Sequence, residues 1–221
     1  AAAMGDPEPT GGDALTVRGS LDKWTWPIMA QATGGKHFTK NRQGQPYVDQ
    51  NFDNYSVEYT YADGTKLMHY GRTIEGCHNE FASYIHGTKG FGTFSKNGHW
   101  PAPSALYSGF TPNPKNETWK FPARETNPYQ DEWEDLLDAI RNDKPYNEAE
   151  RGALASQVCN MGRMAAHTGQ RVMWDDALNA DPLAPEIEKL AGLGGDSAPV
   201  KADADGFYPT PQPGITKKRE Y

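Results

Sequence analysis

The sequence predicts an α+β fold in which a large, mainly antiparallel open sheet precedes two helices. Residues 54–61 alternate apolar and polar side chains, the period-two pattern of a strand with one buried face. Turn sequences at Asp63-Gly64 and Asn97-Gly98 favour antiparallel neighbours. Residues 127–168 instead repeat apolar side chains at helical spacing. We therefore expect two helices packed on one face of the sheet, followed by an extended C-terminal tail.

The start of the chain has few regular patterns. Residues 1–12 are rich in Pro and Gly and predict a connector, whereas residues 13–21 resemble a first strand. Trp24, Trp26 and Ile28 then form a cluster. This cluster is either a hydrophobic plug or a ring surface for a sugar, and the usual burial of tryptophan favours the plug.

The middle of the chain predicts a long loop and then a meander. Residues 33–50 are polar and Gly-rich, and loops of this length often carry function. Because short turns join the apolar segments that follow, successive strands should pair with one another. These strands are expected at residues 54–61, 66–72, 81–86, 91–94 and 117–121, with a short edge strand at 170–174.

Residues 127–141 carry the clearest helical signals. Asn127 is a suitable N-cap, and Pro128 is tolerated in a first turn because its missing N–H has no helical partner. An apolar stripe follows at i, i+3, i+4 and i+7, formed by Trp133, Leu136, Leu137 and Ile140. Pro145 ends this pattern.

A second helix is expected from about Asn147 to Gly169. Asn147 and Glu150 resemble a capping box, and Gly169 is placed to end the helix. Its apolar stripe consists of Leu154, Val158, Met161 and Ala165. From residue 179 onward the chain is rich in Asp, Pro and Gly, which predicts a tail that wraps the domain surface.

Charge and cysteine content exclude some partners. The 221-residue chain has a formal net charge of −7, which argues against a nucleic-acid partner and against an anionic membrane surface. No apolar run approaches the ~20 residues of a membrane span. Cys77 and Cys159 are too few for a disulfide framework and are either two buried thiols or one bridge.

The sequence offers no cofactor or metal motif. It has no Gly-x-Gly-x-x-Gly, and residues 87–90 lack the spacing of a phosphate loop, so a hairpin turn explains them. Ligand-type side chains crowd together at Glu75, Cys77, His78 and Glu80, but without the paired spacing of a zinc site. We therefore predict neither a metal site nor a cofactor-binding residue in this chain.

Arg72, His78 and Tyr129 are the side chains best suited to hold a polar ligand. A guanidinium such as that of Arg72 can anchor hydroxyls or a carboxylate, and the phenol of Tyr129 stands at a helix start, where a cleft could form. Local hydrogen bonding or packing explains the same residues equally well. The acidic residues of the first helix fit a solvent-exposed face better than a glycosidase pair.

Several motifs, taken in order, resemble the C-terminal domain of the Gfo/Idh/MocA oxidoreductases of bacterial type. One is Asn-Pro-Tyr-Gln-Asp-Glu-Trp at residues 127–133. The others lie at residues 54–64, 71–72, 76–77, 85–90, 137–141, 146–150, 206–209 and 213–214. The resemblance covers most of the chain from Asn54 onward and rests on the order and spacing of these motifs.

The resemblance implies a domain that works beside a Rossmann domain holding NAD or NADP. Residues 1–12 would be a connector, residues 13–178 the domain that binds substrate and forms oligomers, and residues 179–221 a wrapping tail. The substrate would be a sugar or cyclitol, with Arg72, His78 and Tyr129 near its pocket. The sheet would form the interface of a homo-oligomer, in the cytoplasm or periplasm of a bacterium.

Three features of that family are missing from this sequence: the cofactor fingerprint, the Glu-Lys-Pro motif and the Asp/His acid–base pair. We therefore expect the chain to lack the Rossmann domain, to contain no catalytic residue, and to be inactive and free of NAD(P) by itself. Two alternatives stay open. The chain could be a stand-alone carbohydrate-binding or assembly module, or part of an NAD-dependent glycosidase of the same fold.

Overall fold

The computed structural model describes residues 26–46, 51–98, 103–122, 127–180 and 202–217. The predicted connector and the strand expected at residues 13–21 lie outside these ranges, as does Trp24. The chain divides into two compact units, one formed by residues 1–75 and 148–221 and the other by residues 76–147.

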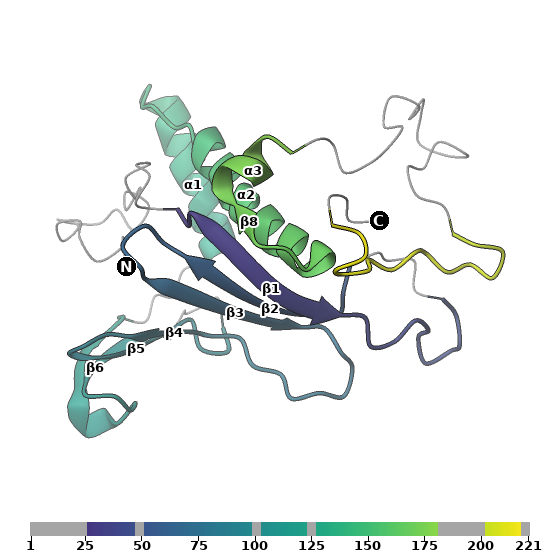
Figure 1. Cartoon of the computed structure of the whole chain (residues 1–221). Helices are drawn as coiled ribbons and strands as arrows, with labels where there is room; N and C mark the ends of the chain where they lie inside the picture. The colour runs from purple at the N-terminus through teal and green to yellow at the C-terminus, as the bar shows by residue number, and fades with distance from the viewer. Residues whose placement is uncertain (1–25, 47–50, 99–102, 123–126, 181–201, 218–221) are drawn as a thin grey trace. The chain divides into compact units, whose positions relative to one another are not determined.

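The first unit contains a four-stranded antiparallel sheet, called sheet 1 below (Figure 1). In sequence order its strands are β1 (Met29–Gly35), β2 (Asn54–Thr60), β3 (Lys66–Arg72) and β8 (Val172–Met173). They lie side by side in the order β3-β2-β1-β8. The predicted strands at 54–61 and 66–72 and the short edge strand near 172 are therefore confirmed.

The alternation in β2 separates a helix-facing side from an open side. Val57 and Tyr59 are buried, whereas the intervening Glu58 stays half-buried on the opposite face. The turn that joins β2 to β3 is closed by the Tyr61 N–H donating to the Thr65 carbonyl at 2.9 Å. Gly64 in this turn has φ 86°, a left-handed conformation that favours glycine, so the predicted turn is confirmed.

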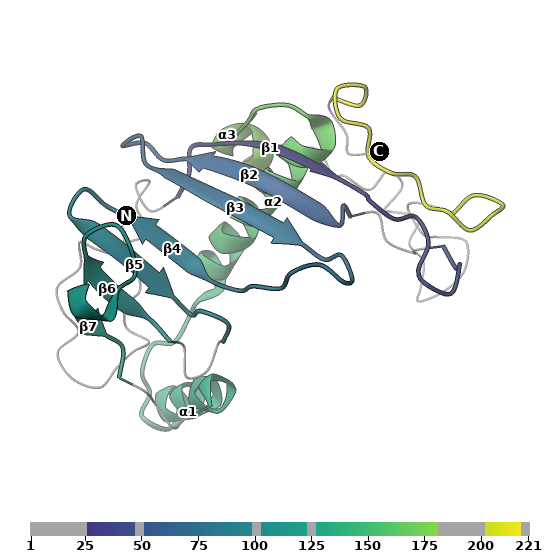
Figure 2. The same cartoon turned by 90° about the horizontal axis from the view of Figure 1, so that it is seen from below.

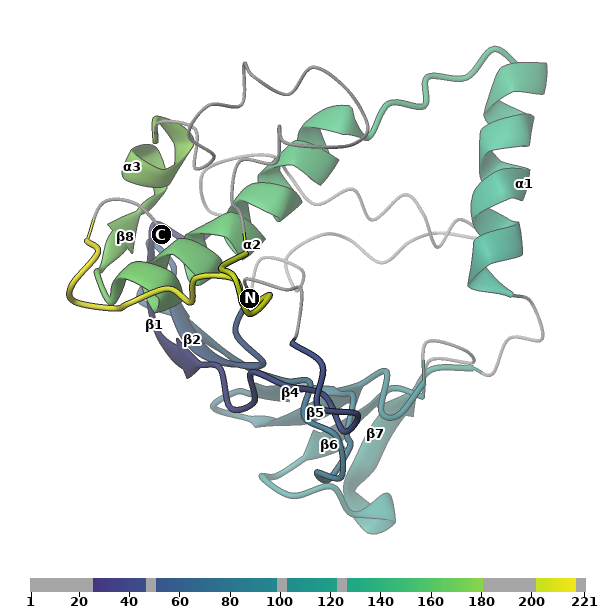
Figure 3. The ribbon, with the colours of Figure 1, turned by 90° about the vertical axis from the view of Figure 1, so that its right-hand side faces the viewer.

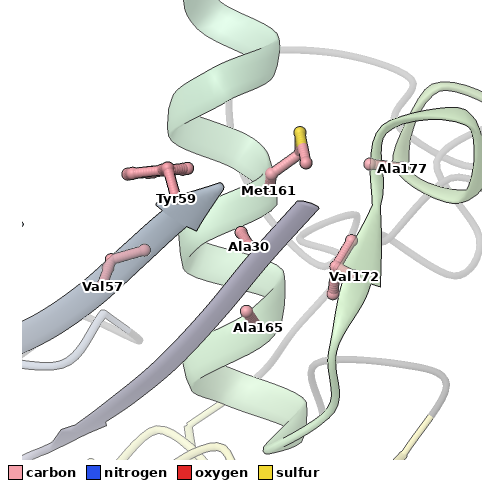
Figure 4. Close-up of a cluster of buried hydrophobic side chains, with 7 residues drawn as sticks. All are labelled: Ala30, Val57, Tyr59, Met161, Ala165, Val172 and Ala177. Atoms are coloured by element: carbon pink, nitrogen blue, oxygen red, sulfur yellow. The ribbon is translucent and has the colours of Figure 1, made fainter. Parts of the chain in front are cut away.

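Helix α2 (Ala149–Thr168) crosses one face of sheet 1 and contacts β1, β2 and β8. Helix α3 (Trp174–Leu178) follows β8 and packs beside α2. Figure 4 shows the resulting apolar core between helix and strands. Its buried members are Ala30, Val57, Tyr59, Met161, Ala165, Val172 and Ala177. Of the predicted stripe of the second helix, Met161 and Ala165 are in this core, Val158 packs against it and Leu154 does not belong to it.

The two ends of α2 differ in how well the sequence anticipated them. Gly169 ends the helix with φ 68°, as predicted. At the start, Glu148 is the N-cap and makes no side-chain capping hydrogen bond. The expected capping box from Asn147 and Glu150 is therefore wrong.

The second unit contains another four-stranded antiparallel sheet, called sheet 2 below (Figure 2). Its strands β4 (Ser83–His86), β5 (Gly90–Phe94), β6 (Ala105–Ser108) and β7 (Glu117–Lys120) pair in sequence order. A short 3-10 helix (Pro114–Asn116) precedes β7. The α+β class and the meander are thus confirmed, with the described strands arranged in two sheets instead of one large sheet.

Helix α1 (Pro128–Arg141) begins as predicted. The Asn127 side-chain oxygen accepts a hydrogen bond from the Tyr129 N–H at 3.0 Å, and Pro128 occupies the first turn. Its apolar stripe was expected to pack on a sheet. That expectation is wrong, because Trp133, Leu137 and Ile140 are exposed.

Other differences concern β1 and the two cysteines. Residues 33–35 belong to β1, so the loop predicted at 33–50 begins after Gly35. Cys77 and Cys159 are free thiols and both are exposed, so the expectation of either buried thiols or a bridge was wrong. Trp26 is half-buried and stacks on Trp174 at 6.4 Å between ring centroids, whereas Ile28 of the predicted plug is exposed.

Candidate functional site

Arg72 lies at one end of sheet 1, where β1 ends, β2 begins and β3 ends. The strand register aligns Gly35, Asn54 and Arg72 in one row across the sheet. Residues paired in this way share a face, and this row lies on the face opposite α2. Arg72 is exposed there, so its guanidinium can reach solvent or a ligand.

Asp53 organises this end of the sheet. One carboxylate oxygen accepts the backbone N–H groups of His37 and Phe38, at 2.6 and 3.2 Å. The other oxygen accepts from the Asn54 side-chain amide at 2.9 Å. The backbone carbonyl of Asp53 accepts the Thr73 N–H at 2.8 Å. One residue therefore joins the segments leaving β1 and β3, and so holds the backbone that follows Arg72.

Beneath this end lies a buried aromatic cluster of Phe52, Tyr55 and His167. His167 is completely buried near the end of α2, and its Nε2 lies 2.8 Å from the Tyr55 hydroxyl. The same hydroxyl accepts the Phe52 N–H at 3.0 Å. The Phe52 ring meets the His167 ring edge-on, with centroids 4.6 Å apart. This cluster ties the start of β2 to α2, which makes the sheet end rigid.

Two surface interactions hold the neighbouring loops. The Arg163 side chain on α2 donates to Asn51 at 3.0 Å. Arg42 forms an ion pair with Glu75 at 2.8 Å, just after Arg72 in the chain. Both are exposed and individually weak, but together they limit the paths that these loops can take.

The other two predicted ligand residues lie in the second unit. His78 is exposed in the segment between β3 and β4. Tyr129 is in the first turn of α1 with 68% of its surface exposed. Because Arg72 belongs to the first unit, a common pocket for the three side chains stays a prediction.

Among the acidic side chains of α1, Asp138 is engaged by a basic neighbour. Asp138 accepts a hydrogen bond from Lys144 at 2.7 Å, and this contact lowers the pKa of the carboxyl group below its usual value. A carboxyl group that stays ionised cannot serve as a general acid near neutral pH. Asp138 therefore acts as a surface charge.

Among the described residues, neither a cluster of metal-ligating side chains nor a parallel strand pair is found. None of the described His, Cys, Asp and Glu side chains form a group of three or more that could hold a metal. All described strand pairs are antiparallel. A dinucleotide phosphate instead sits on a Gly-rich turn between a parallel strand and a helix. Within the same parts of the chain, no helix is long and apolar enough to cross a membrane.

Sheet 2 carries an aromatic row that the sequence patterns did not reveal. Tyr84 stacks on Phe91 at 5.9 Å, and His86 and Tyr107 flank the same ring at 4.8 and 6.2 Å. The Tyr84 hydroxyl donates to Glu80 at 2.8 Å, and this bond raises the pKa of the phenol. Phe91 is itself buried, so the row is a packing feature of the sheet.

Solved structures with a similar fold are oxidoreductases. The chain aligns with an aldose-aldose oxidoreductase from Caulobacter crescentus, determined in complex with glycerol, at a TM-score of 0.51 and 15% identity, covering 67% of this chain and 41% of that one. A putative oxidoreductase from Thermotoga maritima aligns at 0.47 and 18% identity, covering 66% and 40%. An oxidoreductase domain protein from Kribbella flavida aligns at 0.46 and 15%, covering 66% and 44%.

The sequence comparisons do not assign this chain to a family. No protein-family profile matches the sequence, and no curated protein is significantly similar to it. The chain spans less than half the length of the three similar structures. The similarity to the Caulobacter enzyme shows that this chain shares the fold of part of an oxidoreductase.

Proposed function

We propose that this chain is the substrate-binding and oligomerisation domain of an NAD(P)-dependent oxidoreductase that acts on a sugar or cyclitol. The observation that supports this most is the fold shared with the aldose-aldose oxidoreductase, a protein whose name states a sugar substrate. The ordered motifs that resemble the Gfo/Idh/MocA C-terminal domain point the same way. Fold alone does not fix function, so the proposal depends on the site.

The sheet end around Arg72 supports the substrate part of the proposal. A guanidinium offers several N–H donors in a fixed plane, which suits the hydroxyl groups of a sugar. Asp53 and the buried cluster under it hold the surrounding backbone in place. A pre-ordered surface of this kind binds a small polar ligand at lower entropic cost than a flexible one. We also propose His78 and Tyr129, both in the second unit, as substrate-binding residues.

The nicotinamide cofactor would be held by a part of the protein outside this chain. The antiparallel pairing of every described strand supports this, because a dinucleotide phosphate usually sits on a Gly-rich turn between a parallel strand and a helix. When bound, the cofactor would supply the hydride, and this chain would hold and orient the sugar. A titration of tryptophan fluorescence with NADH should give no saturable energy transfer. Saturation at micromolar NADH would contradict this assignment.

Saturation-transfer NMR tests the substrate assignment. We expect signals from at least one of D-glucose, D-xylose and myo-inositol at millimolar concentration. Arg72→Ala should weaken that binding about tenfold or more, because a hydrogen bond to a charged group contributes roughly 1.5–3 kcal/mol. Arg171→Ala is the matched control, since Arg171 is also an exposed arginine of the first unit. Equal binding by both variants would contradict a role for Arg72.

A further inference from the structure

Residues 202–217 form a strap with its own local structure. Asp203 closes a turn in which its N–H donates to the Phe207 carbonyl at 2.8 Å. Its carboxylate accepts the Asp205 and Phe207 N–H groups at 3.0 and 2.8 Å. Gly206 in this turn has φ 85°, a left-handed conformation. The strap therefore enters the first unit with a defined shape.

One end of the strap is attached to the end of α2. Figure 3 shows the strap, in yellow, running beside this helix. The Gly214 N–H donates to the Thr168 carbonyl at 2.8 Å. Pro213 packs on Gly169, where an added Cβ would lie 3.1 Å from the Pro213 ring. Pro211, between this attachment and the turn, is buried.

The other end of the strap is attached to the loop of residues 36–46. The Lys40 ammonium lies over the Phe207 ring, 5.4 Å from its centroid. Pro46 lies against Gly206, where an added Cβ would be 3.3 Å from the Pro46 ring. Lys40 and Pro46 face each other in an isolated antiparallel bridge, so the strap contacts the neck of the turn at residues 41–45.

Two other parts of this loop are held separately. Asp53 fixes the backbone at His37 and Phe38, at the start of the loop, and Arg42 in its turn is paired with Glu75. The loop also has a small hairpin of its own. The Asn41 N–H donates to the Gln45 carbonyl at 2.9 Å, the Gly44 N–H donates to the Asn41 carbonyl at 3.0 Å, and the Asn41 side chain accepts the Gln43 and Gln45 N–H groups. Most loop residues are exposed, and such segments open at low free-energy cost unless another element covers them.

We propose that the strap locks the 36–46 loop, so that the two segments open and close together as one unit. The strap joins the end of α2 to the neck of the loop at Lys40 and Pro46, and the cluster at His167 joins the same helix end to the start of the loop through Phe52 and Asp53. Release of the strap removes the contacts at the neck, while those made by Asp53 and Arg42 stay. The loop with its strap is called the flap below.

This flap borders the row that contains Arg72. The loop leaves the sheet at Gly35, which shares that row, and Arg42 contacts the segment that follows Arg72. A consequence for substrate binding rests on the proposed function, whereas the lock itself does not depend on it.

Hydrogen exchange of the full chain, followed by mass spectrometry, tests the lock. Phe207→Ala removes the ring beneath Lys40 and should raise exchange in residues 39–46 more than about twofold, as expected for loss of an exposed cation–π contact and its packing. The reciprocal change Lys40→Met should raise exchange in residues 203–207 by a similar factor. Exchange in β1 and β2 should stay unchanged in both variants.

Ile215→Ala is the matched control. Ile215 belongs to the same strap but is 78% exposed, so its loss should leave exchange in both segments unchanged. Two outcomes would overturn the proposal: a rise below about twofold in the loop of Phe207→Ala, or a rise confined to the mutated segment in both variants. Neither readout involves a sugar, so a failed lock is distinguishable from a failed function.

Discussion

At the scale of single residues, Gly162 decides how closely α2 approaches sheet 1. An added Cβ at this position would collide with the Tyr59 hydroxyl and would lie 3.2 Å from Val57 Cγ1. The Tyr59 hydroxyl also donates to the Val158 carbonyl of the same helix at 3.0 Å. Helix and strand therefore meet at a contact that only glycine permits.

We expect Gly162→Ala to destabilise the protein by about 1–3 kcal/mol, the usual cost of overpacking a core. Gly152→Ala is the matched control on the same helix, because nothing lies within 4 Å of its added Cβ. That variant should instead gain about 0.5–1 kcal/mol from the higher helix propensity of alanine. Urea unfolding followed by circular dichroism would compare them. Equal shifts in the unfolding midpoint would contradict the close contact.

Tyr59 gives a second prediction at this scale. Burial raises the pKa of its phenol to about 12 from an ordinary value of 10.0, with a smaller contribution from Cys159. Because the fold favours the neutral phenol, this group contributes stability that is fully present below pH 10 and is lost as the pH rises towards 12.

Urea unfolding at pH 8, 10 and 11 would measure this loss. The wild-type midpoint should fall over this range by more than that of Tyr59→Phe, which has no phenol to ionise. The variant should also start lower at pH 8, because it lacks the hydrogen bond to Val158. Parallel pH dependence in the two proteins would show that Tyr59 does not carry the effect.

Residue roles at the candidate site were the least predictable from sequence. Arg72 was chosen for its chemistry and is exposed at a sheet end, but its ligand stays a prediction. Asp53 and His167 were missed because their partners are remote in sequence. Asp53 binds backbone groups 15 and 16 residues away, and His167 meets a tyrosine 112 residues away. No local pattern reports such contacts.

At the scale of elements, secondary structure was predictable where neighbouring residues in the sequence carry the pattern that determines it. The period of β2, the turn at Gly64 and the cap at Asn127 were all predicted from adjacent residues. Strand β1 was missed for a physical reason. Its helix-facing positions are Ala30, Ala32 and Gly34, which are small because α2 and Phe52 lie close above them. Such a strand lacks the alternation of bulky apolar and polar side chains from which strands are predicted.

Helix α1 shows that a helical pattern predicts the helix but not which of its side chains are buried. Its apolar stripe predicted a buried face, yet Trp133 and Ile140 are exposed while Ala139 is buried. Helical spacing indicates which residues share a side, but it does not identify the surface that covers them. The same reasoning applies to α2, whose stripe was predicted and whose partner strand β1 was not.

At the scale of the whole molecule, sheet 1 presents an open face on the side opposite α2. The register places Glu58, Met68 and Tyr70 on this face. Glu58 is neutralised there by Lys66 at 2.8 Å and hydrogen-bonded by Gln31 at 3.2 Å. The face thus combines satisfied polar groups with exposed methionine and tyrosine side chains, a composition that protein interfaces favour.

We predict that the protein forms a dimer or larger oligomer through this face. Met68→Asp should weaken association about tenfold or more, because it would bury an unpaired carboxylate at the interface. Leu67→Asp is the matched control. Leu67 precedes Met68 on β3, is 46% exposed against 48% for Met68, and points to the opposite face of the sheet.

Light scattering coupled to size exclusion would report the mass of each variant. The wild type and Leu67→Asp should elute as the oligomer at high micromolar concentration, and Met68→Asp should shift towards the 24.4 kDa monomer. If both variants dissociate, the interface would instead involve the edge strand β3, whose unpaired backbone groups can also join two chains. A wild-type monomer at that concentration would contradict association through sheet 1 altogether.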